Sequence, residues 1–171
     1  MRILVGSIAA IVLALTAGAR AAEEWGIDHE KVAQFTARVV DVACALKGDC
    51  PANCGDGRRQ LGFLSDDGKL RVAAKGSTDF AGAVHDLLPY CGKTIEVDGL
   101  LIENPAITIY MAQRIREGAD KPWIATTRFA ADWEARHGKT EQWFRDDPLV
   151  KEVIAEDGVL GIKGLAPPVP K

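Results

Sequence analysis

Four cysteines constrain this chain more than any other feature, because three of them are crowded into one short stretch. The stretch CALKGDCPANCGDGRRQ contains Cys44, Cys50 and Cys54, and Cys91 lies further along in LLPYCGK. Four cysteines allow three different disulfide pairings. They could also be thiolate ligands of a metal ion or part of a redox centre. The compartment in which the chain folds is the first criterion for choosing among these roles.

The first residues predict export from the cytoplasm. A basic residue precedes an apolar run over residues 3–17, and the sequence ARA at residues 19–21 fits the small-x-small pattern of signal-peptide cleavage. We therefore predict a signal peptide at residues 1–21, with cleavage before Ala22. An uncleaved anchor is the alternative, but the apolar run is shorter than the roughly 20 residues that span a bilayer. The prediction is a periplasmic or secreted protein with no stable membrane insertion after cleavage.

The charge of the chain points away from nucleic acids. The net charge is −3, and it becomes −5 without the signal peptide, because two arginines leave with it. Binding to a phosphate backbone depends on clustered Lys and Arg, and the sequence has no basic run and no Gly-rich phosphate loop. No G-x-S-x-G or H-E-x-x-H motif occurs either. Nucleic acid is therefore not an expected partner.

The periodicity of the first segments predicts a short helix and then a strand. Asp28 is placed to cap a helix in GIDHEKVAQF, because its side-chain oxygen can accept the free amides of a first turn. The pattern then alternates over residues 38–46, which predicts a strand with Val40, Val42, Cys44 and Leu46 on its apolar face.

The clearest local signal is a β-hairpin in RRQLGFLSDDGKLRVAA. Asp67-Gly68 lies between two alternating runs, and such turns favour residues that tolerate positive φ. Alternation predicts that one face of each arm points inward. These inward residues are Leu61 and Phe63 on the first arm, and Leu70, Val72 and Ala74 on the second.

A helix and two further strands follow the hairpin. Residues 77–92 predict a helix because Phe80, Val84, Leu87 and Cys91 form one apolar stripe, with Ser77 or Thr78 as its cap and Gly92 after its end. The segments KTIEVDGLLI and AITIYMAQRI alternate again and predict strands.

The resulting order is five strands with one helix between the third and the fourth. This order resembles the OB-fold, a small Greek-key barrel, and the resemblance is in element order and size only, without a functional motif. It implies an α+β protein with a five-stranded OB-like barrel at residues 22–118. Another α+β domain with a meandering sheet is the alternative.

The composition changes after residue 118. Residues 119–162 hold three of the four tryptophans and show helical rather than alternating patterns, while residues 163–171 end in APPVPK and predict an extended tail. Asp147-Pro148 is a typical helix start, followed by the apolar stripe Leu149, Val150, Val153 and Ile154. We expect this helical extension to cover part of the barrel, with Trp133 buried; the alternative is that it is presented to a partner.

In an oxidising compartment, an even number of cysteines predicts disulfides. Cys44 is predicted on the apolar face of a strand and Cys91 on the apolar stripe of a helix, so both are expected to reach the same core. Cys50 and Cys54 flank a predicted turn. We therefore predict the pairs Cys44–Cys91 and Cys50–Cys54.

A metal site is the alternative role for the cysteines. Copper or zinc would be held by Cys50 and Cys54, with Cys44 or Cys91 assisting, because thiolates suit both metals. The C-x5-C-x3-C spacing is not a usual zinc spacing, and the C-x-x-C pair of dithiol oxidoreductases is absent. No other cofactor is indicated.

Basic residues on the hairpin suggest one binding surface. Arg59, Lys69 and Arg71 are predicted on the outer face of strands two and three, which is the usual ligand face of an OB barrel. Tyr110 and Arg114 on the last strand could extend the surface toward an anionic ligand. The alternative is an ordinary solvated strand face.

Trp143 and Arg145 in the extension suggest a second surface, because Trp and Arg dominate the energetics of protein interfaces. The leading hypothesis is thus an exported, non-catalytic binding or accessory protein that acts on a protein partner or a small anion. A periplasmic metal-handling protein is the alternative. An enzyme whose site is assembled from distant residues has no positive support in the sequence.

Overall fold

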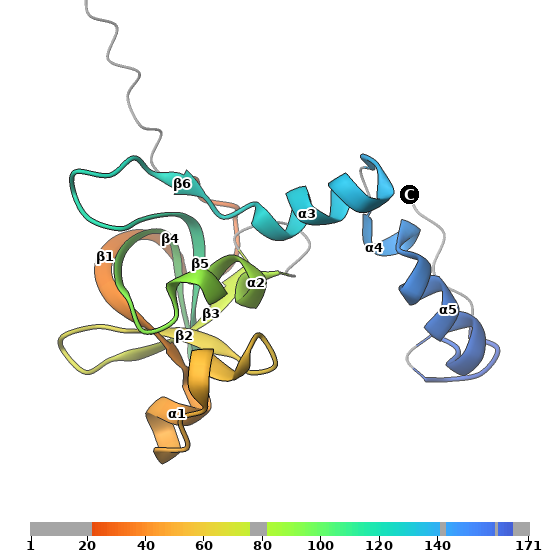
Figure 1. Cartoon of the computed structure of the whole chain (residues 1–171), viewed down its shortest axis with the longest axis horizontal. Coiled ribbons are helices and arrows are strands. Elements are labelled where there is room, and N and C mark those ends of the chain that lie inside the picture. The colour runs from red at the N-terminus through yellow and green to blue at the C-terminus, as the bar shows by residue number, and fades with distance from the viewer. Residues whose placement is uncertain (1–21, 76–81, 141–142, 160, 166–171) are drawn as a thin grey trace, which may run out of the picture.

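A computed structural model of the chain describes residues 22–75, 82–140, 143–159 and 161–165. The predicted signal peptide, the cap and Phe80 of the predicted helix, and the end of the tail lie outside the described residues. Figure 1 shows a strand-rich body with α1 and α2 at its sides, from which α3, α4 and α5 lead away as an arm. We call residues 128–165 the arm.

The strands form a closed barrel with the predicted OB-like topology. The sheet order is β3-β2-β1-β4-β5-β6, and a parallel pairing between β3 and β5 closes the barrel of β1 to β5. The fold is therefore α+β with a five-stranded barrel, as the sequence predicted. The strands are β1 (Glu30–Asp41), β2 (Leu61–Leu64), β3 (Leu70–Lys75), β4 (Thr94–Asn104), β5 (Ile107–Arg116) and β6 (Ile124–Ala125).

Short helices fill the connections of the barrel, and longer ones build the arm. The predicted helix between the third and fourth strands is present as α2 and η2, where η denotes a 3-10 helix. None of the helices among the described residues is long and apolar enough to cross a membrane. The helices are α1 (Val42–Lys47), η1 (Ala52–Gly55), α2 (Ala83–Leu87), η2 (Leu88–Tyr90), α3 (Arg128–His137), α4 (Trp143–Asp146) and α5 (Pro148–Asp157).

The first strand begins earlier and ends earlier than its sequence pattern predicts. No helix forms over residues 26–35; β1 already pairs with β4 at Glu30, opposite Ile102. The strand ends at Asp41, whose side chain accepts a hydrogen bond from the Cys44 backbone and so caps α1. Cys44 therefore lies on a helix, and Leu46 is 70 % exposed instead of facing the core.

The hairpin forms where it is predicted, but its second arm presents the opposite face. Phe63 pairs with Arg71 and Gly62 with Val72, so Arg71 shares the side of Phe63. Along β3 this side continues with the buried residues Ala73 and Lys75. The expectation that Leu70, Val72 and Ala74 point inward, with Arg71 on the outer face, was wrong.

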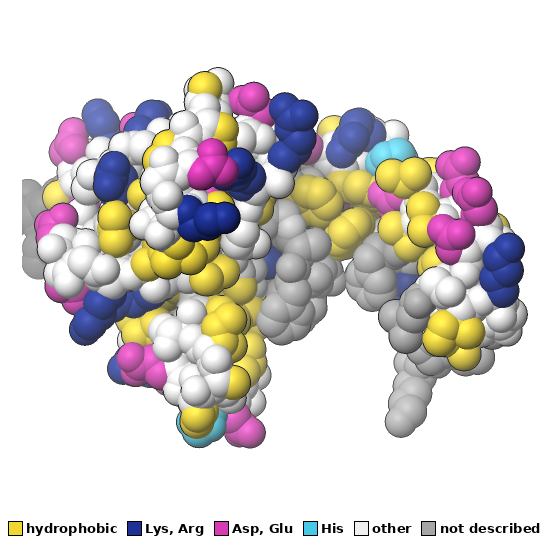
Figure 2. Space-filling model, turned by 90° about the horizontal axis from the view of Figure 1, so that it is seen from below, with side chains coloured by type: hydrophobic (Ala, Val, Ile, Leu, Met, Phe, Trp, Pro, Cys, Tyr) yellow, Lys and Arg dark blue, Asp and Glu magenta, His cyan; other side chains and the backbone are white. Residues whose placement is uncertain are grey.

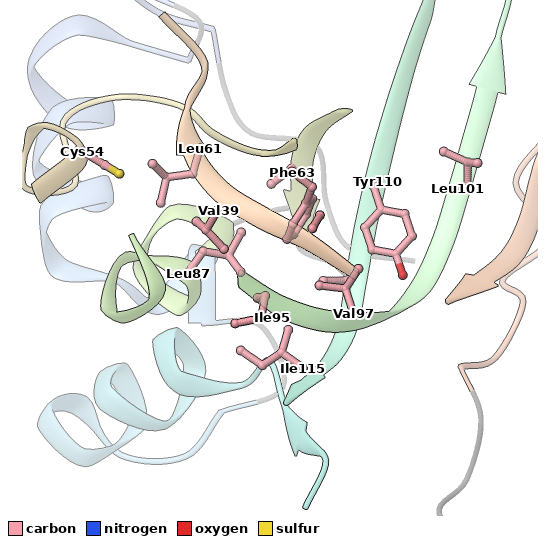
Figure 3. Close-up of a cluster of buried hydrophobic side chains, with 13 residues drawn as sticks. Val39, Cys54, Leu61, Phe63, Leu87, Ile95, Val97, Leu101, Tyr110 and Ile115 are labelled. Carbon is pink, nitrogen blue, oxygen red and sulfur yellow. The ribbon is translucent and has the colours of Figure 1, made fainter. Parts of the chain in front are cut away.

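The core of the barrel centres on three aromatic rings. Phe35, Phe63 and Tyr110 meet edge to face, with ring centroids 4.6–6.4 Å apart. Figure 3 shows Phe63 and Tyr110 among the aliphatic side chains of this cluster. The Tyr110 hydroxyl donates a hydrogen bond to the Ala33 carbonyl at 2.7 Å, and burial raises the pKa of the phenol. Tyr110 is thus a core residue, and the expectation that it lies on the outer face was wrong.

A second, smaller apolar cluster lies on the outside of the barrel. Leu100, Ile102 and Met111 are buried on the outer side of β4 and β5. Trp25 and Ile27, from the segment that precedes β1, pack against them. This packing holds residues 22–29 against the barrel.

The arm does not cover the barrel as expected. At its start the backbone amide of Phe129 donates to the buried Asp86 of α2 at 2.8 Å. Beyond this contact the arm leads away, and α5 is far from the strands in Figure 1. Trp133 is only 3 % exposed, as predicted, but its ring packs on His137 and Trp143 of the arm itself.

Candidate functional site

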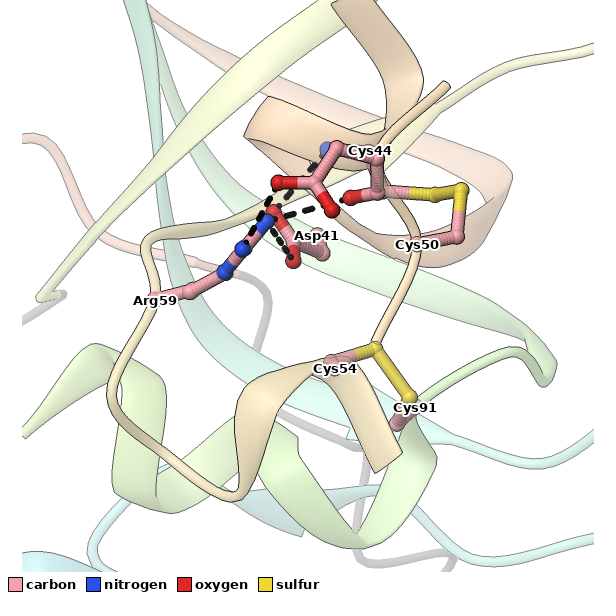
Figure 4. Close-up of a disulfide and its surroundings, with 7 residues drawn as sticks. Asp41, Cys44, Cys50, Cys54, Arg59 and Cys91 are labelled. Atoms are coloured by element: carbon pink, nitrogen blue, oxygen red, sulfur yellow. Dashed lines mark hydrogen bonds and ion pairs between the residues drawn. A yellow bond between two sulfur atoms is a disulfide. The ribbon is translucent and has the colours of Figure 1, made fainter. Parts of the chain in front are cut away.

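The four cysteines form two disulfides, in a pairing that differs from the predicted one. Cys44 bonds to Cys50, and Cys54 bonds to Cys91 (Figure 4). The physical reason is that Cys44 lies on α1, beyond the end of β1, and so points toward the following loop and not into the core. The buried residue is Cys54, and it links η1 to the residue that follows η2.

The disulfides change what the cysteines can do chemically. Each of the four sulfurs is bonded to one other sulfur in a disulfide, so no thiolate is present to hold copper or zinc. The metal-handling alternative would require the reduced protein. No group of three or more His, Cys, Asp or Glu side chains within the described part of the chain is arranged to bind a metal ion. The two disulfides indicate an oxidising, extracytoplasmic environment.

Arg59 holds the first disulfide loop against the barrel. Its guanidinium donates to the Asp49 carboxylate at 2.8 Å and the Asp49 carbonyl at 3.1 Å, and it lies 3.4 Å from the buried Asp41 carboxylate. Figure 4 shows this side chain directed at the loop that carries Cys44 and Cys50. The hydrogen bond with Asp49 raises the pKa of Arg59. Two carboxylates already neutralise this arginine.

The other predicted basic residues of the hairpin do not form one surface. Lys69 is exposed and pairs locally with Asp67 at 3.4 Å. The Arg71 guanidinium lies 4.7 Å above the Phe35 ring and donates to the Ser65 hydroxyl at 2.6 Å, closing one end of the barrel. Lys69, Arg71 and Arg59 are therefore occupied by separate local partners.

Arg114 belongs to a ladder of ion pairs on β4 and β5. Asp98 lies opposite Arg114 and Glu96 opposite Arg116 in the strand register, and both pairs are in contact. Trp123 stacks over both guanidinium groups, at 4.8 and 4.5 Å. The alternating acids Glu96 and Asp98 in KTIEVDGLLI are a sequence signal that could have indicated partners for these arginines.

A pocket at the junction of barrel and arm was not predicted. Its volume is about 510 Å³, and its walls come from four separate parts of the chain. Apolar walls are supplied by α2, η2 and α3, and polar groups by the turn after η1. The residues that define it best are Asp56, Gln60, Val84, His85, Leu88 and Phe129.

One wall of this pocket is a left-handed turn. Asn53, Cys54 and Asp56 have φ values of 48–51°, and Gly55 and Gly57 continue the same conformation. Residues other than glycine adopt this region at a cost of roughly 1–2 kcal/mol each. The Cys54–Cys91 disulfide fixes the turn from within, so the pocket wall is held by a covalent bond.

His85 and Asp132 form a hydrogen-bonded pair at the pocket. The imidazole Nε2 lies 2.7 Å from the carboxylate, and this hydrogen bond lowers the pKa of Asp132. A carboxylate-oriented histidine can act as a general base. However, none of the described lining residues offers a hydroxyl, thiol or amine nucleophile.

The arm is built on a chain of aromatic rings that leads away from the pocket. Phe129 contacts Trp143 at 4.9 Å, and Trp143 contacts Trp133 at 6.0 Å between ring centroids. Trp143 and Arg145 are half-buried on α4 of the arm, on the segment for which a second binding surface was predicted. Their predicted role in partner binding stays a prediction.

The last helix of the arm leaves two residues of its apolar stripe exposed, while Val150 and Ile154 are half-buried. Leu149 is 66 % exposed and Val153 49 % exposed, although the two are four residues apart on one face. Ile162 and Leu165 beyond the helix are also exposed. Figure 2 shows the arm as a separate lobe with hydrophobic and acidic side chains on the face in view. Clusters of exposed apolar side chains mark interaction surfaces more often than isolated ones do.

Asp147 joins the two halves of the arm, and this predicts a pH effect. Its carboxylate accepts the Trp133 indole N–H at 2.6 Å and the Leu149 and Val150 amides at 2.9 and 3.1 Å. The Trp133 and Val150 hydrogen bonds hold the pKa of Asp147 below its usual range. Its stabilising effect on α5 is therefore present above the unfolded pKa and is lost as the pH falls through the lowered one.

We expect NMR chemical shifts of residues 148–157 to show loss of helix as the pH falls below the ordinary aspartate pKa of about 4. Asp147→Asn keeps a capping oxygen but cannot titrate, so its shifts should lose this pH dependence. An identical transition in Asp147→Asn would show that another group is responsible. Asp147→Ala should lower the helicity of α5 at neutral pH.

Comparisons with protein-family models, with curated proteins and with solved structures found no match to this chain. The candidate sites therefore rest on the geometry alone.

Proposed function

We propose that the protein is an exported, non-catalytic binding protein, periplasmic or secreted, that engages a partner protein through α5 of its arm. The observation that carries the proposal is the exposure of Leu149 and Val153 on a helix that is held away from the barrel. A small anion is the weaker candidate for a ligand, because Arg59 and Arg114 are paired with carboxylates.

The chemistry of α5 specifies the kind of partner. Leu149 and Val153 have the i, i+4 spacing of helices that insert an apolar face into a groove. The helix has ten residues and is thus about 15 Å long, enough for a groove of modest length. It also carries Glu152, Glu156 and Asp157 against a single Lys151. We expect an apolar groove with basic residues along its rim.

The rest of the molecule supports this function by fixing where the arm begins. The buried Asp86 accepts the amide at the start of α3, so the arm is attached to the barrel at a defined point. The pocket lies beside this attachment, with Phe129 in its wall. A partner seated on the arm could also place an apolar side chain there.

The proposal predicts that a charge on the apolar stripe of α5 abolishes partner binding. Leu149→Glu and Val153→Glu should each lower recovery of the partner about tenfold or more, because a carboxylate would be desolvated in an apolar groove. The measurement is quantitative mass spectrometry of proteins that co-purify with the tagged, exported chain from the organism that encodes it.

Val32→Glu is the matched control for these variants. Val32 is 42 % exposed on β1, so the same chemical change is made on another exposed apolar position. Its partner recovery should equal that of the unaltered protein. Equal recovery with all three variants would contradict the proposal. If only a second copy of the chain is recovered, α5 mediates self-association and the proposal of a different partner protein is wrong.

A further inference from the structure

The residue that follows the predicted cleavage site is already bound to a buried carboxylate. The backbone nitrogen of Ala22 lies 3.2 Å from Asp98 Oδ2. Ala22 is 9 % exposed and Asp98 only 2 %. Arg114 donates to the same carboxylate oxygen from Nε at 2.7 Å and Nη2 at 2.5 Å. The buried Asp98 carboxylate thus accepts hydrogen bonds from the Arg114 guanidinium and from the Ala22 nitrogen, which cleavage would turn into the amino terminus.

The segment after Ala22 is held in place by contacts that do not depend on Asp98. The Glu23 backbone and the Gln113 side-chain amide exchange two hydrogen bonds: the Glu23 amide donates to Gln113 Oε1 at 2.9 Å, and Gln113 Nε2 donates to the Glu23 carbonyl at 2.7 Å. Trp25 packs on the outer apolar cluster of β4 and β5. The position of the Ala22 nitrogen is therefore fixed by its neighbours before any charge is considered.

We propose that Asp98 is the binding site for the α-ammonium group that cleavage before Ala22 creates. Hydrolysis of the bond between residues 21 and 22 converts a neutral amide N–H into an NH3⁺ group. The ammonium offers more donors than the amide, and a charge-assisted hydrogen bond to a carboxylate is about twice as strong as a neutral one. Asp98 accepts both cations, since a carboxylate has about four lone-pair positions.

This assignment makes removal of the signal peptide part of the folding of the domain. The bulge at Asp98 and Gly99 brings β4 close to β5, where a Cβ on residue 99 would collide with the Met111 carbonyl oxygen. The amino terminus therefore docks next to a point where β4 and β5 approach too closely for a side chain at residue 99. The mature chain should be more stable than the same chain with a blocked or extended amino terminus.

The test is a double-mutant cycle on the mature protein with both disulfides formed. Four proteins are compared by urea unfolding: residues 22–171 with a free or an Nα-acetylated Ala22, each with Asp98 or with Asp98→Asn. Acetylation should raise the unfolding equilibrium constant about tenfold with Asp98 and less than about twofold with asparagine. An equal effect of acetylation in both backgrounds would overturn the proposal.

A second measurement does not require the Asp98→Asn protein to fold. On the folded, unaltered mature protein, the rate at which acetic anhydride acylates the α-amine is measured at about neutral pH, where free α-amines with a pKa of about 8 react readily. We expect this rate to be at least about tenfold lower than in urea. An equal rate would overturn the proposal, as would an amino terminus of the exported protein at any residue other than Ala22.

Discussion

Replacing both Cys54 and Cys91 by serine is expected to lower the free energy of unfolding by about 4 kcal/mol. The two cysteines are 37 residues apart, and the chain-entropy model gives this value for a loop of that length. The bond also holds Cys54 and its neighbours in a left-handed turn that they would otherwise leave. The free energy of unfolding of a typical domain is about 5–15 kcal/mol, so this loss would be a large part of the total stability. Urea unfolding of the oxidised proteins measures it.

The other disulfide supplies the matched control. Cys44 and Cys50 are only six residues apart, so the same model predicts a loss of about 2 kcal/mol when both are serine. The variants also test the pairing itself. The protein without Cys54 and Cys91 should contain no free thiol, because Cys44 and Cys50 remain bonded to each other. Two reactive thiols in that variant would contradict the pairing.

Replacing Lys75 by methionine is expected to cost about 3–5 kcal/mol, because it leaves a buried carboxylate without its cation. Lys75 and Asp86 form an ion pair with both side chains at most 4 % exposed, and the Lys75 ammonium also donates to the Thr126 carbonyl. Asp86 in turn accepts the Phe129 amide. This group therefore joins β3, α2 and the start of the arm.

The size of the effect is checked by urea unfolding, and its cause by a second variant. In Lys75→Met/Asp86→Leu neither charge of this buried pair is left, so part of the lost stability should return. The start of the arm should still be loosened, because the Phe129 amide has lost its acceptor. Faster amide hydrogen exchange at residues 128–132 would report this. A loss below about 1 kcal/mol in Lys75→Met would contradict the account of this ion pair.

The order of the barrel could be predicted from the sequence because it rests on local signals. Alternation marks β4 and β5, and Gly68, with a φ of 77°, supplies the hairpin turn at the predicted place. Each signal spans fewer than a dozen residues and depends little on the rest of the chain. The position of α2 between β3 and β4 followed from the same kind of pattern.

The inward face of β3 could not be predicted, because it depends on a difference of one residue in the hairpin. The Ser65 amide donates to the Lys69 carbonyl, so residues 66–68 form the turn. A turn of only two residues, at Asp67 and Gly68, would have placed Val72 and not Arg71 opposite Phe63. A shift of one residue moves every side chain of a strand to the other face. Both faces of β3 are partly buried, so periodicity alone did not settle the register.

The disulfide pairing and the pocket were missed for a related reason. Asp41 ends β1 and caps α1, which turns Cys44 away from the core and frees Cys91 for Cys54. The pocket draws its walls from four parts of the chain that meet only in the folded protein. The exposure of α5 could not be predicted from the sequence either, because an apolar stripe has the same sequence pattern whether it is buried or exposed.

The measurement that tests the proposed binding surface most directly is site-specific photo-crosslinking in the organism that encodes the protein. A photoreactive side chain is placed at Val153 on the arm and, in a separate protein, at Val32 on the barrel, since both positions are exposed and apolar. We predict one dominant crosslinked partner protein from position 153 and none from position 32. Crosslinks that arise only from position 32, or no protein crosslink from position 153, would contradict a binding surface on the arm.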